Sequence, residues 1–281
     1  MKRILVLVNA DKPGTSESLQ ALCPWLGAHA RIETHPFTDA PFKVDHDLVV
    51  VLGGDGSILK AARILQGREI PVVGINMGKL GYLAEFSAEE FCQKFEAIAA
   101  GRLPMSKRMM LSAGFERADG GKSGEYLVLN DIVLTGGDFH RMVAVQATID
   151  GEDVTTYFGD GVLVSTPTGS TAYCMAAGGP ILAPRMEAMV IVPICPHSLT
   201  YRPLVVRPDS EIVLGPAGLQ KEVLCVVDGQ DQVRLARGDR VRVSRAGASF
   251  LLVHNPDHPP FATLREKLHW GQTPKYNKGG A

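Results

Sequence analysis

The sequence predicts an α/β N-terminal domain with a parallel, Rossmann-like sheet, followed by a mostly β C-terminal domain that is antiparallel and sandwich-like. In the first hundred residues, short and wholly apolar runs alternate with segments of helical spacing, which is typical of strands covered on both faces. Beyond them the apolar runs are short, some alternate with polar residues, and turn residues separate them. The length of 281 residues is enough for two such domains.

The first domain is expected over residues 1–103. Three segments are continuous runs of β-branched residues and leucine: 3–9, 47–52 and 70–76. Three further segments carry apolar residues at helical spacing: 16–26, 57–66 and 88–100. Strands that alternate with helices are joined by right-handed crossovers, so the sheet should be parallel.

The second domain is expected over residues 104–257. Six short apolar segments predict its strands: 141–150, 161–167, 210–215, 222–227, 239–245 and 250–255. Between them, 118–125 predicts a polar hairpin loop. Residues 258–281 are assigned to a closing helix, begun by Pro259 or Pro260, and a tail. Packing of this segment back on the first domain is left open.

The net charge and the cysteines indicate which partners and which compartment the protein has. The formal net charge is −1, so the chain lacks the basic field that nucleic acid or an anionic membrane attracts. No apolar stretch approaches the ~18 residues of a membrane span. The five cysteines form no C-x-x-C pair and are interpreted as reduced thiols packed as small apolar groups. We therefore expect a cytoplasmic protein with neither nucleic-acid nor membrane partners.

The stretch "VVVLGGDGSILKAAR" (49–63) places Asp55 in a glycine-rich turn before an expected helix. The N–H groups of Gly56, Ser57 and Ile58 would face a phosphate there, although the turn fits neither G-x-G-x-x-G nor a Walker loop. A carboxylate repels phosphate, which leaves two interpretations of Asp55. It either caps the helix through the N–H of Ile58 or acts as a general base on a hydroxyl that attacks a phosphoryl group.

A second glycine-rich region, "YFGDGVLVSTPTGSTAYCMAAGGPIL" (157–182), is rich in small hydroxyl residues. This composition argues against core packing, and it offers N–H groups and hydroxyls that suit a sugar and its phosphates. The alternative is a Ser/Thr-rich turn between strands.

Five segments, taken in order, carry a resemblance to a known family: "GGDGSILKAAR", "GINMGKLGYL", "LNDIVL", "DGVLVSTPTGSTAYCMAAGGPIL" and "PICPHSLTYRPLVV". Across residues 49–230 the chain resembles the bacterial NAD kinases. The resemblance implies transfer of the γ-phosphoryl group of ATP to the 2′-hydroxyl of the adenosine ribose of NAD, giving NADP. It also implies a divalent metal, Mg²⁺ or Mn²⁺, and assembly into a homodimer or homotetramer.

The resemblance implies site residues position by position. It makes Asp55 the proton acceptor and assigns binding roles to Asp55, Gly56, Lys60, Asn130, Asp131, Arg141, Asp160, Thr171, Ala172, Tyr173, Ala176 and Gln230. Lys60 would lie near phosphates, the Asn130 and Asp131 pair would hold adenine or ribose, and Asp160 would meet the nicotinamide side. Two positions depart from the family pattern: Phe158 stands where a basic residue is common, and Ala176 where serine is common.

Two rival functions share part of this pattern. A lipid kinase of the diacylglycerol or sphingosine type shares the "GGDG" turn, but it should lack "STPTGSTAY". A non-catalytic dinucleotide sensor on the same fold would have no use for a carboxylate beside phosphate. Both remain alternatives to the kinase.

Overall fold

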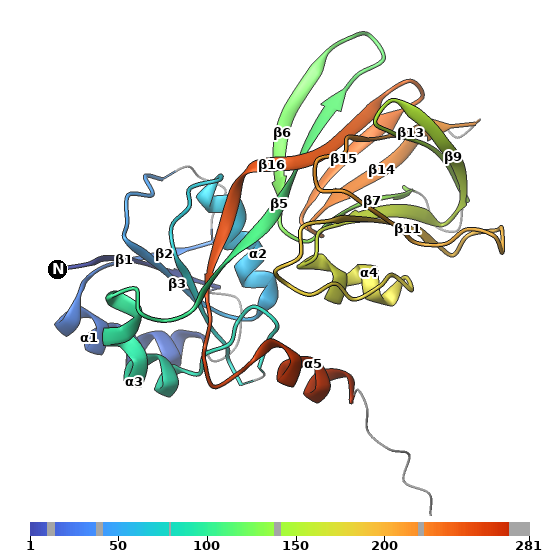
Figure 1. Ribbon diagram of the computed structural model, residues 1–281. Coiled ribbons are helices and arrows are strands. Elements are labelled where there is room, and N and C mark those ends of the chain that lie inside the picture. Colours follow the sequence, from blue (N-terminus) through green and yellow to red (C-terminus); the bar gives the residue numbers. More distant parts are fainter. Residues whose placement is uncertain (10–14, 38–41, 79, 138–141, 219–221, 270–281) are drawn as a thin grey trace, which may run out of the picture.

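The computed structural model describes residues 1–9, 15–37, 42–78, 80–137, 142–218 and 222–269. Figure 1 shows two lobes. Two long strands, β5 (Met105–Glu116) and β16 (Arg240–Val253), run from one lobe into the other and pair antiparallel along their length. The lobes are therefore joined by continuous sheet.

The N-terminal lobe is built on four parallel strands in the order β2-β1-β3-β4. Their bounds are β1 Arg3–Val8, β2 Arg31–Pro36, β3 Leu48–Leu52 and β4 Val72–Ile75. The helices are α1 (Thr15–His29), α2 (Asp55–Leu65) and α3 (Ala88–Ala99). The parallel sheet and its three helices confirm the predicted α/β domain, and β2 is an additional edge strand.

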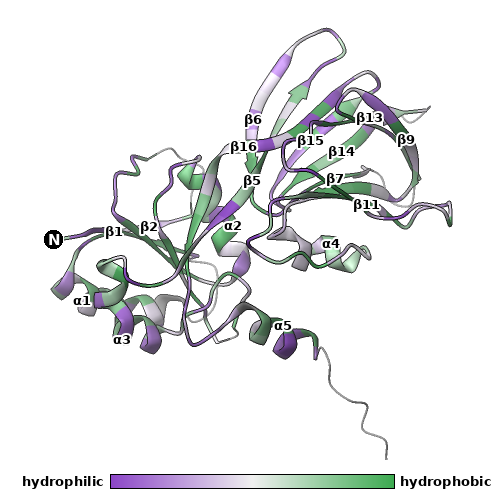
Figure 2. Ribbon diagram, viewed as in Figure 1, coloured by the Kyte–Doolittle hydropathy of each residue, from purple (hydrophilic) through white to green (hydrophobic). Residues whose placement is uncertain are grey.

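Successive side chains of a strand point to opposite faces of the sheet, so the N-terminal core has two layers. Ile4 and Val6 of β1 pack in a cluster with α1 and α3, whereas Leu5 and Leu7 pack in a second cluster with α2. In Figure 2 these strands are coloured as hydrophobic, while α3 shows hydrophilic segments outside. The start of α2 is thereby fixed at the carboxyl end of β3, on the side of the second lobe.

The C-terminal lobe consists of two facing sheets around one apolar cluster. One is a six-stranded antiparallel sheet in the order β12-β11-β10-β7-β14-β15. The other continues the N-terminal sheet through β16, β13, β8 and β9, with β5 paired to β16 and β6 paired to β5. The remaining strand bounds are β6 Lys122–Val128, β7 Asp131–Gly136, β8 Val143–Ile149, β9 Glu152–Gly159, β10 Gly161–Ser165, β11 Met189–Ile194, β12 Leu204–Val206, β13 Ile212–Ala217, β14 Glu222–Val227 and β15 Asp231–Ala236. Short helical pieces are η1 (Gly169–Thr171) and α4 (Tyr173–Ala176). The sandwich-like prediction is confirmed.

Several local expectations need correction. The two strands expected at 239–245 and 250–255 are one strand, β16, with a register shift between Arg245 and Ser249. Near its end Leu252 pairs in parallel with Val72 of β4, so the chain returns to the N-terminal sheet. Residues 157–182, interpreted as unsuited to the core, include the wholly buried strand β10.

The closing helix is α5 (Pro260–Leu268), which follows β16. Just before it, His258 lies 2.9 Å from Glu90 and Asp257 lies 2.6 Å from Lys94, both of α3. The Lys94–Asp257 ion pair and the His258–Glu90 contact attach the C-terminal segment to the N-terminal lobe. The domain boundaries at residues 103 and 257 stay a prediction. Among the described residues no helix combines the length and the apolar character that a membrane crossing needs.

Candidate functional site

The glycine-rich turn lies between β3 and α2, and its backbone is already hydrogen-bonded. Gly54 is the N-cap residue of α2, and its carbonyl accepts from the N–H of Ser57 at 2.9 Å and of Ile58 at 3.3 Å. These two amides were expected to face a phosphate, so that part of the prediction was wrong. Gly53 needs its glycine, because a Cβ there would lie 2.6 Å from the Cβ of Ser57.

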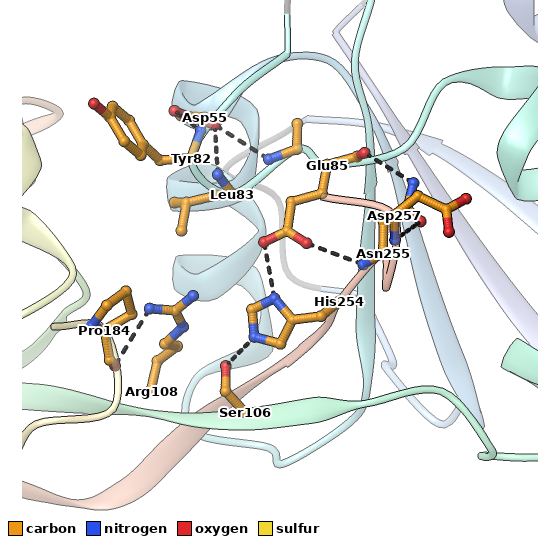
Figure 3. A network of polar contacts seen from close by, with 11 residues as sticks. Asp55, Tyr82, Leu83, Glu85, Ser106, Arg108, Pro184, His254, Asn255 and Asp257 are labelled. Carbon is orange, nitrogen blue, oxygen red and sulfur yellow. Dashed lines mark hydrogen bonds and ion pairs between the residues drawn. The ribbon is translucent and has the colours of Figure 1, made fainter. Parts of the chain in front are cut away.

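Asp55 binds a second turn instead of capping its own helix. Its Oδ2 accepts the main-chain N–H of Tyr82 at 2.9 Å. Its Oδ1 accepts the N–H of Leu83 at 2.9 Å and of Ala84 at 3.2 Å (Figure 3). The N-cap interpretation, which required a bond to Ile58, is therefore wrong. The carboxylate ties the start of α2 to the turn that follows β4.

A second aspartate makes the same kind of contact in the C-terminal lobe. Asp228 accepts the main-chain N–H groups of Leu129, Asn130 and Asp131 at 2.8, 2.7 and 3.1 Å. This fixes the backbone just before β7. Within the part of the chain that the structure describes, the side-chain oxygen of Asn130 is buried without a hydrogen-bond partner. An unpaired buried acceptor is costly, so this atom is suited to receive a ligand donor.

Burial dominates the electrostatics of Asp131 and Asp228. Burial, followed by the charge of Asp228, raises the pKa of Asp131 to about 7. Burial raises the pKa of Asp228 to about 6 against its three amide donors, which favour the ionised form. Because three main-chain donors favour the ionised form of Asp228, whereas the pKa of Asp131 is the higher of the two, Asp131 is the carboxyl group that holds a proton nearer neutral pH. Asp131 can then act as donor as well as acceptor.

The hydroxyl-rich turn after β10 packs directly on this segment. Thr166 donates its hydroxyl to the carbonyl of Leu129 at 2.6 Å, and Ser170 donates to Pro167 at 2.7 Å. A Cβ at Gly169 would lie 2.6 Å from the carbonyl carbon of Asn130, which explains the glycine. These hydroxyls serve the fold, so the expectation that they contact a sugar was wrong for them.

Tyr173 follows this turn as the first residue of α4, and 46% of its surface is exposed. Burial of its ring raises its pKa first, followed by the negative charges of Cys195, Asp160 and Asp131. The thiol of Cys195 in turn hydrogen-bonds Asp160, which raises its pKa. Cys195 is exposed, so the packing interpretation was wrong for this cysteine, whereas Cys174 is buried.

The structure thus brings Asp131 and Asp160 close enough to Tyr173 for their charges to act on it, and Asn130 precedes Asp131 in the chain. Gln230 lines a cleft of about 430 Å³ together with Asp228 and Leu59 of α2. Lys60 is exposed, with its Nζ 5.8 Å from the ring centre of Phe37. The remaining predicted positions are exposed or half-buried: Gly56, Thr171, Ala172 and Ala176. Arg141 lies outside the described residues.

Sequence reasoning assigned no role to Gly81, Tyr82 or Asp228. The first two stand in the "GKLGYL" stretch, and Asp228 stands in "VVDGQ" beside the residue that was assigned. Within the described ranges, no three His, Cys, Asp or Glu side chains gather closely enough to hold a metal ion.

Two family models match the chain, described as the ATP-NAD kinase N-terminal domain over residues 4–103 and the ATP-NAD kinase C-terminal domain over residues 129–255. The two-lobed fold, with its glycine turn at the start of α2, is accordingly that of a kinase. Because both halves match, the chain belongs to the NAD kinase family.

Individual relatives agree with this assignment. The chain is 43% identical over 226 residues to an NAD kinase of Geobacter metallireducens, covering 80% of each chain. It is 36% identical over 286 residues to one of Geotalea daltonii, covering 97% of this chain and 100% of the relative. Family membership confirms the resemblance and decides against the lipid kinase and sensor alternatives.

Two solved structures of kinases have a similar fold. Yeast NADH kinase, crystallised with NADH, superposes with a TM-score of 0.87 at 25% identity, covering 97% of this chain and 89% of that one. An NAD kinase from Archaeoglobus fulgidus in complex with ATP gives a TM-score of 0.78 at 25% identity, covering 95% and 98%.

Proposed function

We propose that this protein transfers the γ-phosphoryl group of ATP to the 2′-hydroxyl of the adenosine ribose of NAD, giving NADP. The proposal rests above all on the position of Asp55, a carboxylate at the first turn of α2 and beside the junction of the lobes. In phosphoryl transfer the protein mainly positions groups and offsets charge, and the attacking hydroxyl must lose a proton.

Asp55 is proposed as the general base, and its hydrogen bonds indicate which oxygen takes the proton. An ionised carboxylate has about four lone-pair positions. Oδ1 accepts two amides and Oδ2 accepts only that of Tyr82. Oδ2 therefore keeps a position for the ribose hydroxyl, while the other contacts hold the carboxylate still.

The C-terminal lobe is proposed to hold the dinucleotide. The unpaired oxygen of Asn130 would accept from the adenine amine or a ribose hydroxyl, and Asp131 would bind ribose. Tyr173 and Asp160, which lie close enough to interact, would contact the nicotinamide half. The roles of Gly56, Lys60, Thr171, Ala172, Ala176 and Gln230 stay proposals on the same basis.

A divalent metal, when bound, would offset charge on the phosphates. With no three-ligand cluster among the described side chains, it is proposed to bind mainly through the phosphates of ATP. A cytoplasmic location and a homodimer or homotetramer remain predictions from the sequence.

Product identity tests the function directly. Purified protein is incubated with ATP, Mg²⁺ or Mn²⁺, and either NAD or an NAD analogue that lacks the adenosine 2′-hydroxyl. We expect NADP from NAD and no phosphorylated product from the analogue. Absence of NADP with either metal would refute the function, and phosphorylation of the analogue would refute the assigned hydroxyl.

A further inference from the structure

A buried polar network lies where the turn that binds Asp55 meets the two strands that cross between the lobes (Figure 3). Its members are Glu85, Ser106, His254 and Asn255, none of which exposes more than 8% of its surface. Ser106 belongs to β5, and His254 and Asn255 follow β16 directly. The proposed function has so far given none of the four a role.

The Glu85 carboxylate is bound to both residues that follow β16. Its Oε1 lies 2.8 Å from His254 Nδ1, and its Oε2 accepts the main-chain N–H of Asn255 at 3.0 Å. The Asn255 side chain donates in return to the main-chain carbonyl of Glu85 at 3.4 Å. Three contacts therefore join Glu85 to the end of β16.

His254 uses both of its ring nitrogens. Because a carboxylate only accepts hydrogen bonds, Nδ1 carries the proton of the bond to Glu85. Nε2 lies 2.7 Å from the hydroxyl of Ser106, and the main-chain N–H of His254 donates to the carbonyl of Pro104 at 2.8 Å. His254 is thereby fixed at the start of β5 as well as at the end of β16. Ser106 is buried, so it anchors the ring and does not meet a substrate.

Glu85 directly follows the turn whose main-chain N–H groups bind Asp55. The donors to Asp55 are the amides of residues 82–84. The N–H of Gly81 closes this turn by donating to the carbonyl of Ala84 at 3.0 Å. The turn is therefore attached to α2 through Asp55 and to the crossing strands through Glu85. A displacement of Glu85 would move the amides and, with them, the carboxylate of Asp55.

Stability alone does not account for a buried network of this kind. Replacement of buried ionic groups by apolar residues of similar volume is often neutral or stabilising. A fully satisfied polar network, in contrast, fixes one arrangement of its members. Within the described part of the chain, no side-chain nitrogen or oxygen of Glu85, Ser106, His254 or Asn255 is buried without a hydrogen-bond partner. The network therefore defines one position for the residue that ends the turn.

We propose that Glu85, oriented by His254, is a positioning residue for the phosphoryl transfer. It fixes the turn of residues 81–84 relative to the strands that cross between the lobes, and the amides of that turn fix the carboxylate of Asp55. Glu85 touches no reacting group and acts through the main chain. The inference rests on the proposed function, because it concerns the placement of the proposed base.

Glu85→Gln is compared with Asp239→Asn, a matched change at a buried carboxylate of the C-terminal lobe. Asp239 accepts the N–H groups of Ala118 and Ala236 at 2.9 and 3.0 Å and the guanidinium of Arg117 at 2.7 Å. Each variant loses one acceptor oxygen. Glu85→Gln should lower kcat at saturating NAD and ATP by about tenfold or more, because a small displacement of a catalytic group is costly. Asp239→Asn should keep kcat within about threefold of the unmodified protein.

Two substitutions of His254 separate its two side-chain contacts. The amide nitrogen of asparagine occupies the position of Nδ1, and that of glutamine occupies the position of Nε2. His254→Asn therefore keeps a donor for Glu85, whereas His254→Gln keeps only the contact with Ser106. The kcat of His254→Asn should exceed that of His254→Gln by about fivefold or more. This pair leaves the acid unchanged, so it carries the test if Glu85→Gln does not fold.

Hydrogen exchange followed by mass spectrometry measures the turn itself. Exchange at residues 82–84 should be faster by about tenfold in Glu85→Gln and His254→Gln than in the unmodified protein. In Asp239→Asn the increase should appear at Ala118 instead, because that amide binds Asp239. A fully active Glu85→Gln, equal loss of kcat in the two His254 variants, or unchanged exchange at residues 82–84 would overturn the proposal.

Failure of the function and failure of the positioning role give different results. If the unmodified protein forms no NADP, the proposed function is wrong, and the exchange at residues 82–84 alone decides whether the network fixes the turn. If NADP forms and the Glu85 and His254 variants behave like Asp239→Asn, the function stands and the positioning role is wrong.

Discussion

Gly81 packs against Asp55 so closely that a Cβ at position 81 would lie 3.0 Å from the Cγ of the aspartate and in direct conflict with its Oδ1. The same Cβ would lie 3.1 Å from the amide nitrogen of Ala84, which donates to that oxygen. The glycine therefore gives the carboxylate the space to reach the amides of the turn, and Asp55 cannot keep its position if that space is filled.

Gly81→Ala should accordingly move the carboxylate. We expect a loss of roughly 1–3 kcal/mol in the free energy of unfolding from overpacking. Turnover should fall by about 100-fold, because small misplacements of a catalytic group are costly. Urea unfolding and initial rates of NADP formation measure the two effects. Gly124→Ala is the matched control, since a Cβ there meets nothing within 4 Å. A fully active Gly81→Ala would show that the position of Asp55 does not matter.

A comparison of Asp55→Asn with Asp228→Asn shows whether Asp55 acts as a general base or only holds the backbone in place. Each aspartate accepts three main-chain N–H groups, so asparagine replaces one acceptor oxygen with an amino group that cannot accept. Both variants should therefore lose about 1–3 kcal/mol of stability. Only Asp55→Asn should lower kcat by roughly 10²- to 10⁴-fold, as expected for loss of a general base.

The measurement is kcat at saturating NAD and ATP, together with urea unfolding of both variants. Asp228→Asn should keep kcat within about tenfold of the unmodified protein, because it contacts no reacting group in our proposal. If kcat fell in the same proportion in both variants, Asp55 would have a structural role only and would not be the general base.

The sequence predicts the central strands of the N-terminal sheet but not the contacts of Asp55. Apolar runs predicted β1, β3 and β4 because central parallel strands are buried on both faces. The edge strand β2, "RIETHP", has no such signal because most of it faces solvent. The bond from Asp55 to Leu83 joins residues 28 apart in the chain, and no periodicity encodes such a contact.

The hydroxyl-rich turn was misjudged for a related reason. A small polar composition usually indicates exposure, yet Ser165, Thr166 and Ser170 are fully buried. Their hydroxyls satisfy main-chain carbonyls within the fold, which removes the cost of burying them. Only the folded arrangement distinguishes such internal bonds from free hydroxyls that could bind a sugar.

The pair of Asp131 and Asp228 predicts a pH dependence of stability. Both have a pKa raised above 3.8, to about 7 and about 6, so the folded protein retains their protons to higher pH than the unfolded chain does. Their contribution to stability is fully present below pH 3.8 and is lost as the pH rises through 7.

Asp131→Asn should remove part of this loss. The free energy of unfolding of the variant minus that of the unmodified protein should increase by about 1 kcal/mol or more from pH 5 to pH 8. One pKa unit corresponds to about 1.4 kcal/mol. Urea unfolding at the two pH values measures the change. Asp209→Asn, a surface substitution, controls for the loss of one negative charge. A difference that stays constant with pH would contradict the assignment of the proton to Asp131.

Cys195 offers a chemical probe of the neighbourhood of Asp160 and Tyr173. It is the exposed cysteine of the five, whereas Cys174 and Cys225 are buried, so iodoacetamide should modify it first. The hydrogen bond to Asp160 and its negative charge raise the pKa of the thiol, which keeps the reactive thiolate scarce at pH 7. Labelling should accelerate as the pH rises.

Asp160→Asn should speed labelling of Cys195 at pH 7 by about 3- to 10-fold, because the repelling charge is gone and the thiolate is more abundant. Asp153→Asn, on the same strand region but bonded to Gln146, should leave the rate unchanged. Saturating NAD should slow labelling if the nicotinamide half lies at Asp160, as we propose. Peptide mass spectrometry after timed quenching gives the rate at each cysteine. Equal rates in the presence and absence of NAD would place the dinucleotide elsewhere.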